Sequence, residues 1–160
     1  MVYKMKFTEF RILTEKKVFG FKSGVYIIVD PKLVMSQKDF GKLSVELDNT
    51  PGNALEYEYN GITIAAFKLS QRVGDYPSNY NNKEVEVTSG KIVVMPRDLI
   101  PDNKFEKEEL ATKAIVTNCK DNFECTIQKN TLKVGNLTVD ISEENSIADN
   151  TNDPNQNTEK

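Results

Sequence analysis

Apolar and polar residues alternate along much of the chain, and short turn signals separate the alternating runs. At the clearest signal, Asn60-Gly61, the alternation covers residues 55–59 and resumes over residues 62–64. Asn-Gly favours a type I′ turn, because both positions tolerate positive φ and the turn matches the twist of paired strands. Four other two-residue signals have similar flanks: Ser23-Gly24, Ser89-Gly90, Lys129-Asn130 and Gly135-Asn136. The pattern predicts a mainly β protein, an antiparallel small barrel or sandwich built from hairpins.

Helical periodicity is scarce. The best candidate covers residues 103–113, with Asp102 or Asn103 as N-cap and glutamates in the first turns, where carboxylates complement the helix dipole. A second short helix is expected to begin at Ser36 and to end at Gly41. The last two turn signals predict a C-terminal three-stranded meander between residues 125 and 141. The expected fold counts one short helix beside its strands, the candidate over residues 103–113.

Two segments are predicted to lack strands and helices. Residues 70–83 combine Gly, Pro and several Asn, and we expect a loop too polar to pack. Residues 142–160 have no aromatic residue and many Asn, Asp and Glu, which predicts a disordered acidic tail. The expected organisation is a barrel or sandwich domain over residues 1–101, a helix and meander extension over 102–141, and the tail over 142–160.

The chain contains no histidine. Histidine is the usual general base near neutral pH and the commonest metal ligand, so Ser–His and Cys–His nucleophile pairs and His-containing zinc sites are excluded. Glycine-rich phosphate loops and calcium-loop motifs are also absent from the sequence. We expect a protein that is not an enzyme, with no catalytic residue, no metal site and no cofactor.

Two pairs of glutamates could still perform acid–base chemistry or hold a cation. Glu56 and Glu58, like Glu84 and Glu86, stand two residues apart and so share one face of a strand. The preferred interpretation of both pairs is a solvated outer face that alternates with buried apolar residues.

The two cysteines, Cys119 and Cys125, have neither zinc-ribbon nor thioredoxin spacing. If residues 120–122 form a hairpin turn, Cys119 faces Phe123 and Cys125 faces Thr117, so the sulfurs are not direct partners. Both are predicted to be reduced thiols.

The net charge of −3 hides a gradient along the chain. Residues 1–42 carry a net charge of +5, whereas residues 43–141 and residues 142–160 carry −4 each. The acidic pI of 5.2 therefore does not argue against an anionic partner. Aromatic residues are interleaved with the early cations, a mixture that suits single-stranded nucleic acid because cations contact phosphates and rings stack on bases. The candidate binding residues are Lys4, Lys6, Arg11, Lys16, Lys17, Lys22, Tyr26, Arg72, Tyr76 and Tyr80.

Several short apolar segments resemble a known family. Phe19-Gly20 after a basic N-terminal strand, Ile92-Val-Val-Met-Pro96, Phe105 and Ala114-Ile-Val-Thr-Asn118 are similar to segments of small accessory proteins of Gram-positive conjugative elements, including helicase processivity factors associated with single-stranded DNA. The chain departs from them at residues 70–83, in the spacing from Pro96 to Asn118, and in the C-terminal meander and tail. The resemblance implies a small barrel that works with DNA-processing machinery, and it carries over no catalytic residue.

The expected function is a nucleic-acid-binding accessory factor of a plasmid, conjugative element or phage in a low-GC bacterium. The alternative is a protein-binding module, such as a phage-encoded inhibitor of a host factor or a virion component, whose partner is a host or element-encoded protein. A weaker alternative is sequestration of a small ligand. Because no apolar run reaches about 18 residues, we expect no membrane partner and a cytoplasmic location.

Overall fold

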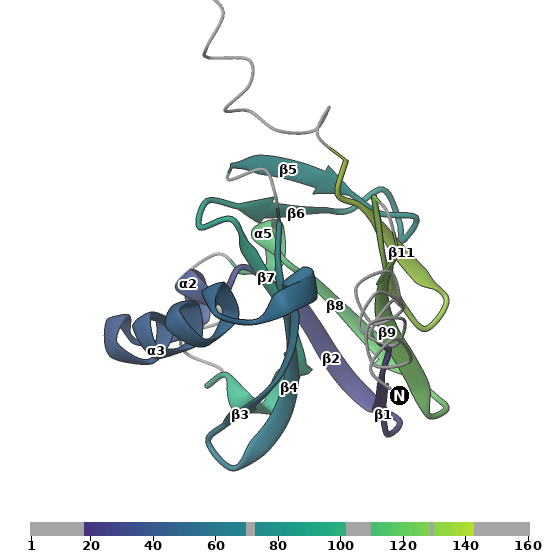
Figure 1. The fold of residues 1–160 in the computed structure, drawn as a ribbon. Coiled ribbons are helices and arrows are strands. Elements are labelled where there is room, and N and C mark those ends of the chain that lie inside the picture. The colour runs from purple at the N-terminus through teal and green to yellow at the C-terminus, as the bar shows by residue number, and fades with distance from the viewer. Residues whose placement is uncertain (1–17, 70–72, 102–109, 129, 143–160) are drawn as a thin grey trace, which may run out of the picture.

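The computed structural model describes residues 18–69, 73–101, 110–128 and 130–142 (Figure 1). Its strands are β1 (Val18–Phe21), β2 (Gly24–Val29), β3 (Ala54–Tyr59), β4 (Ile62–Lys68), β5 (Gly74–Pro77), β6 (Glu84–Val87), β7 (Lys91–Pro96), β8 (Ile115–Cys119), β9 (Phe123–Gln128), β10 (Thr131–Val134) and β11 (Leu137–Asp140). Its helices are α2 (Pro31–Val34), α3 (Gln37–Asp48) and α5 (Leu110–Lys113), with 3₁₀ turns η1 (Pro51–Asn53) and η2 (Arg97–Leu99).

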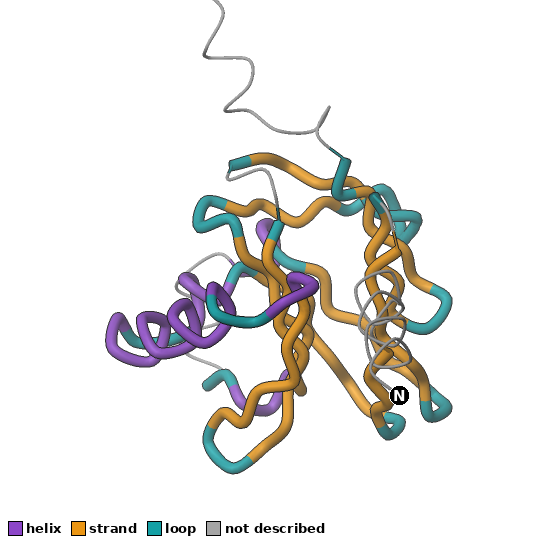
Figure 2. Tube along the Cα trace, viewed as in Figure 1, coloured by secondary structure: helices purple, strands orange, loops and turns teal. Residues whose placement is uncertain are grey.

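The strands, orange in Figure 2, form three sheets. Every pairing in these sheets is antiparallel. Sheet A has the order β1-β9-β10-β11, sheet B the order β3-β4-β7-β2-β8, and sheet C consists of β5 and β6. Sheet C meets sheet A through a bridge between Ser78 and Val139. The predicted mainly β, antiparallel class is confirmed.

Sheet B is the middle layer of the molecule, and both of its faces are covered. Residues 26–29, 64–67 and 92–95 are continuous buried runs in β2, β4 and β7. Every second side chain, including Ile28 and Phe67, packs against sheets A and C, whereas the others, including Ile27, pack with the helical layer. A strand buried on both sides needs apolar residues at consecutive positions, which is why these runs do not alternate.

Three of the five predicted hairpins are confirmed. Tyr59 pairs with Ile62 across Asn60 and Gly61, whose φ values of 53° and 80° fit a type I′ turn. In the C-terminal meander β9 pairs with β10, and β10 pairs with β11 across Gly135 and Asn136. Residue 129, in the first of these turns, lies outside the described residues.

The predictions of hairpins at Ser23-Gly24 and Ser89-Gly90 are wrong. β1 pairs with β9 and β2 pairs with β7 and β8, so the chain leaves sheet A for sheet B at Ser23. β6 pairs with β5, whereas β7 pairs with β2 and β4, so the chain changes sheets again near Ser89. The hairpin between β8 and β9 is wrong for the same reason: Cys119 pairs with Gly24, and Cys125 pairs with Phe19. A turn signal marks a change of direction and does not choose the next partner strand.

The helix expected from Ser36 to Gly41 is longer than predicted. Ser36 is the N-cap, and its hydroxyl oxygen accepts a 3.1 Å hydrogen bond from the Asp39 amide. The helix continues past Gly41 to Asp48 because Leu43 and Leu47, four residues apart, bury their side chains in the apolar cluster on sheet B.

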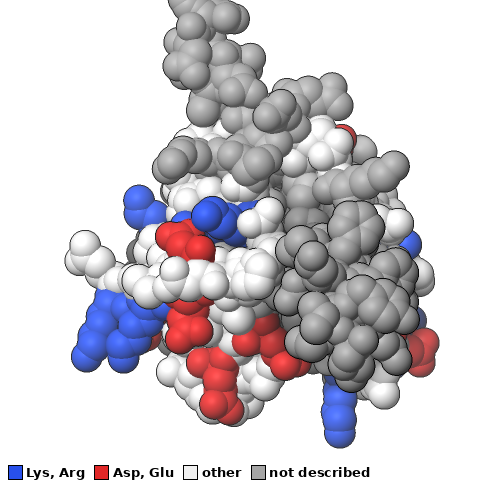
Figure 3. Space-filling view, viewed as in Figure 1, with Lys and Arg blue, Asp and Glu red and all other residues white. Residues whose placement is uncertain are grey.

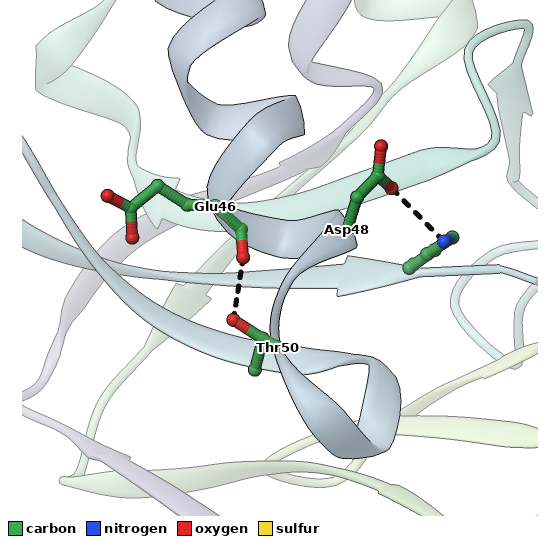
Figure 4. A network of polar contacts seen from close by, with 4 residues as sticks. Glu46, Asp48 and Thr50 are labelled. Atoms are coloured by element: carbon green, nitrogen blue, oxygen red, sulfur yellow. Dashed lines mark hydrogen bonds and ion pairs between the residues drawn. The ribbon is translucent and has the colours of Figure 1, made fainter.

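Two polar contacts hold the chain in place where α3 ends (Figure 4). The Thr50 hydroxyl donates to the Glu46 carbonyl over 2.7 Å, and Lys68 of β4 forms a 3.1 Å ion pair with Asp48.

The prediction that residues 70–83 form an unpacked polar loop is also wrong. β5 lies within this segment, and Tyr76 is fully buried opposite Val85 of β6. Of the helix predicted over residues 103–113, α5 forms the end, while residues 102–109 lie outside the described residues. The tail prediction for 142–160 concerns residues that, apart from Ser142, also lie outside them.

Strands on both sides of residue 101 belong to the same sheets. β8 pairs with β2 in sheet B, and β9 pairs with β1 in sheet A. The part predicted as an extension therefore completes both sheets. Both cysteines are free thiols, as predicted. None of the described helices is long and apolar enough to cross a bilayer.

Candidate functional site

The pairs β1–β9 and β2–β8 form one antiparallel ribbon that bends from sheet A into sheet B. Phe21 pairs with Phe123 before the bend, and Gly24 pairs with Cys119 after it. Residues 22–23 therefore stand opposite residues 120–122, so the β8–β9 side has one residue more. An extra residue acts as a bulge, which bends a ribbon and increases its twist. These two segments are called the corner below.

A hydrogen bond and three aromatic rings hold the corner together. The Ser23 amide donates to the Asn122 side-chain oxygen over 3.0 Å. The Phe21 and Phe123 rings are stacked with centroids 5.5 Å apart, and Tyr26 meets the Phe123 ring edge-on at 4.9 Å. The Tyr26 hydroxyl donates to the Lys22 carbonyl over 2.9 Å. Burial raises the pKa of Tyr26, and the nearby Cys119 thiol adds to the shift.

Two hollows open on either side of Phe123. Both have Asn122 and Phe123 in their lining, so these two residues form a common wall. The two hollows have similar volumes, of about 610 and 600 Å³, and differ in how many residues line them. The one with fewer lining residues, called the smaller hollow, also contains Phe21 and Lys22. The one with more lining residues, called the larger hollow, extends to Tyr80 and the β10–β11 turn. Phe21 and Tyr80 are half-buried, so each hollow has one partly open aromatic ring in addition to Phe123, which is itself half-buried and lines both.

The far wall of the larger hollow is held by hydrogen bonds between the chain after β5 and β11. The Asn79 amide donates to the Thr138 carbonyl over 3.0 Å, and the Thr138 amide donates to the Asn79 side-chain oxygen over 2.9 Å. The Asn79 side-chain nitrogen donates to the Asn136 carbonyl over 3.2 Å. A ligand in this hollow would therefore meet a wall that is already ordered.

Gly135 supports the common wall from the meander side. Its φ is +62°, and a Cβ at this position would lie 3.4 Å from the Phe123 Cβ. A side chain would therefore be strained by the backbone conformation, while its Cβ would make an ordinary van der Waals contact with Phe123, so the positive φ favours glycine here.

The lining suits binding through rings and amides better than it suits bond breaking. The side chains of Asn118 and Asn136 are exposed beside Tyr80 in the larger hollow. The half-buried Cys119 thiol also lines it, and burial raises the pKa of that thiol, which disfavours the nucleophilic thiolate. Within the described ranges, no group of three or more Cys, Asp or Glu residues could hold a metal ion.

The structure brings two of the predicted binding residues to the corner. Lys22 lines the smaller hollow and Tyr80 lines the larger one. Tyr26 is only 7% exposed and Tyr76 is 0% exposed, so their rings belong to the core between the sheets and are not open to a base. The other candidates lie outside the described residues: Lys4, Lys6, Arg11, Lys16, Lys17 and Arg72.

Sequence reasoning missed Phe21, Phe123 and Lys120 as site residues. All three line the hollows, but Phe21 is about a hundred residues from the other two and meets Phe123 only because β1 pairs with β9. The glutamate pairs are separate from this site. Glu56 and Glu58 lie exposed on β3 of sheet B, and Glu84 and Glu86 lie on β6 of sheet C.

Comparison of the chain with protein-family models, with curated protein sequences and with solved structures gave no match.

Proposed function

We propose that this protein is a non-enzymatic binding module that holds single-stranded nucleic acid across the corner. The observation that carries the proposal is the pair of hollows on either side of the Asn122–Phe123 wall, with Phe21 in one and Tyr80 in the other. Consecutive bases of an unpaired strand can stack on such rings, and stacking contributes about 1–3 kcal/mol per base. The exposed side chains of Asn118 and Asn136 offer hydrogen bonds to base edges.

Cations for the phosphate groups come from two places in the chain. Lys22 and Lys120 flank the wall, but Asp121 and Glu124 line the same hollows and offset their charge. The proposal therefore assigns most phosphate contacts to the basic residues that precede β1 in the sequence: Lys4, Lys6, Arg11, Lys16 and Lys17.

The biological setting of the proposal is an accessory factor of a plasmid, conjugative element or phage in a low-GC bacterium. The segments around Phe19, residues 92–96 and residues 114–118, which resemble proteins of conjugative elements, support this setting. A cytoplasmic location is part of the proposal, and two free thiols fit a reducing compartment.

Titration of the full chain with a fluorescein-labelled oligothymidylate at two salt concentrations tests the proposal. We expect log affinity to fall linearly with log salt, because phosphate contacts release counterions. Phe21→Leu and Tyr80→Leu keep apolar volume but remove the ring, and each should weaken binding about tenfold. Lys22→Gln should reduce the salt slope by about one.

Tyr59→Leu is the matched control, because Tyr59 is also half-buried but lies on β3, at the opposite edge of sheet B from β8. It should bind like the unchanged protein. Absence of binding at low salt would refute the proposal, as would equal affinities of the Leu variants and the unchanged protein.

A further inference from the structure

In the part of the chain that the structure describes, one edge of sheet B is open along β3. There β3 is the terminal strand and pairs only with β4, and Tyr59 pairs with Ile62 across a two-residue turn. The residues that flank such a turn exchange hydrogen bonds, and the pattern then alternates along the pair. Tyr59 and Tyr57 therefore bond to β4, whereas Glu58 and Glu56 direct their backbone N–H and C=O groups away from it. Among the described residues, no backbone hydrogen bond from outside the β3–β4 hairpin reaches Glu56 or Glu58.

The surroundings of this edge are acidic. Glu56 and Glu58 are exposed on one face of β3. On the other face the half-buried Tyr57 and Tyr59 lie close to α3. Burial raises the pKa of both tyrosines, and the Asp39 carboxylate raises both further. Figure 3 shows acidic side chains gathered on the face that carries α3 and the β3–β4 hairpin.

Glu46 of α3 also lies near Tyr57 and contributes to its raised pKa. Lys42 is the cation that helical spacing places between Asp39 and Glu46. The five carboxylates of α3 and β3 outnumber the two lysines of α3, Lys38 and Lys42, together with Lys68, which pairs with Asp48. The edge therefore keeps an excess of negative charge.

We infer that the outer edge of β3 binds a basic extended segment of a partner protein, which adds a strand to sheet B. Main-chain hydrogen bonds to Glu56 and Glu58 would supply binding, and side chains at alternate positions would supply specificity. Two positions of the partner segment, with one residue between them, would carry Lys or Arg and lie opposite Glu56 and Glu58. The intervening side chains would lie beside Tyr57 and Tyr59.

The same residues argue against a second copy of this chain as the occupant. In an antiparallel two-fold pairing, the outward-directed residues of one β3 must oppose those of the other. The register that pairs all three outward-directed residues places Glu56 opposite the Glu56 of the other copy, and the next register toward the turn places Glu56 opposite Glu58. Like charges in opposite positions destabilise a strand pair. The carboxylates thus suppress self-pairing and select a basic strand.

Binding of a soluble peptide of alternating Lys and Val to the full-length chain tests the inference, with an alternating Glu–Val peptide as its control. We expect the Lys peptide to bind at least about tenfold more tightly. We also expect it to slow hydrogen exchange at the Glu56 and Glu58 amides. The charge reversal Glu56→Lys/Glu58→Lys should invert the preference between the two peptides. Glu84→Lys, an exposed change on β6, should leave the preference unchanged.

A second variant separates backbone pairing from charge attraction. Glu56→Pro removes an outward N–H, and edge strands tolerate proline at such a position because no bond to the neighbouring strand is lost. The variant should stay folded and lose peptide binding, while oligothymidylate binding at the corner stays the same. Equal binding of the Lys and Glu peptides would overturn the inference, and so would undiminished Lys-peptide binding by folded Glu56→Pro. Both outcomes are independent of whether the corner binds oligothymidylate.

Discussion

The Ser89 hydroxyl donates a 2.6 Å hydrogen bond to Asp30, a residue 59 positions earlier in the chain. Asp30 follows β2 directly, is the N-cap of α2, and is 0% exposed. One of its oxygens also accepts from the Lys32 amide at the start of α2, and the other accepts from the amides of Thr88 and Ser89. A buried carboxyl group is tolerated when its oxygens are satisfied in this way. Asp30 thereby joins sheet B, α2 and the chain between β6 and β7.

We expect Asp30→Asn to lower the free energy of unfolding by about 2–4 kcal/mol. Both carboxyl oxygens face a backbone N–H, so neither orientation of an asparagine amide avoids placing its NH₂ against a donor. Urea unfolding followed by circular dichroism measures the change. Asp98→Asn, an exposed substitution in η2, should stay within about 0.5 kcal/mol of the unchanged protein. A similarly small effect for Asp30→Asn would show that these hydrogen bonds contribute little.

Two glycines provide a matched test of backbone conformation. A Cβ at Gly41 or at Gly61 would meet nothing within 4 Å, so neither substitution creates a clash. Gly61 has a φ of +80°, which strains an alanine, and Gly61→Ala should lower the free energy of unfolding by about 1 kcal/mol.

Gly41 lies inside α3, where alanine is the better helix former. Gly41→Ala should therefore raise the free energy of unfolding by about 0.5–1 kcal/mol. Thermal and urea unfolding of the two variants check the opposite signs. A destabilised Gly41→Ala protein would contradict the continuous helix from Gln37 to Asp48.

Short-range chemistry explains which parts of the fold the sequence predicts. The turn at Asn60-Gly61, the N-cap at Ser36 and the meander around Gly135 depend on residues within a few positions of one another. The choice of partner strands does not depend on such sequence neighbours. The signal at Ser23-Gly24 fits a hairpin, but apolar side chains on β1 and β2 are buried in one cluster between two different sheets.

The candidate site was harder to predict because long-range pairing creates it. Tyr80 and Lys22 were identified from their residue type, but Phe21 and Phe123 become neighbours only when β1 pairs with β9. Tyr76 stands in a polar segment, yet its position opposite Val85 directs it into the core. Composition alone therefore gives the wrong exposure for that ring.

The buried thiol of Cys125 leads us to expect that the protein loses stability at alkaline pH. Burial raises the pKa of its thiol well above the ordinary value of 9.0, so folding favours the protonated form. The contribution of the protonated Cys125 thiol to the free energy of unfolding is fully present below about pH 9. It is lost as the pH rises from the pKa of the thiol in the unfolded chain towards its pKa in the folded protein. The slope of this loss is at most about 1.4 kcal/mol per pH unit.

The Cys125→Ala variant should have a flatter dependence of unfolding free energy on pH above about pH 9, whatever its stability at neutral pH. Urea unfolding at several alkaline pH values measures both slopes. The tyrosines with raised pKa values are present in both proteins, so the difference between the slopes belongs to Cys125. Cys119→Ala, at a half-buried thiol, should change the slope less. Parallel curves for Cys125→Ala and the unchanged protein would contradict the assignment.

Asn122 links the geometry of the corner to its proposed binding. Its side-chain oxygen accepts from the Ser23 amide at an exposed position, where water can replace the lost acceptor. Asn122→Ala should therefore change the free energy of unfolding by less than about 1 kcal/mol. Hydrogen exchange at the Ser23 amide should nevertheless become faster, because the donor loses its partner.

Asn122 also belongs to the wall between the two hollows, so we expect oligothymidylate affinity to fall in Asn122→Ala while the fold is retained. Asn49→Ala is the control, because this exposed asparagine caps α3 through its backbone N–H and lies away from the corner. For both variants, fluorescence titration measures oligothymidylate affinity and hydrogen exchange measures protection of the Ser23 amide. If exchange at Ser23 accelerates and the affinity is unchanged, the position of the wall does not determine binding.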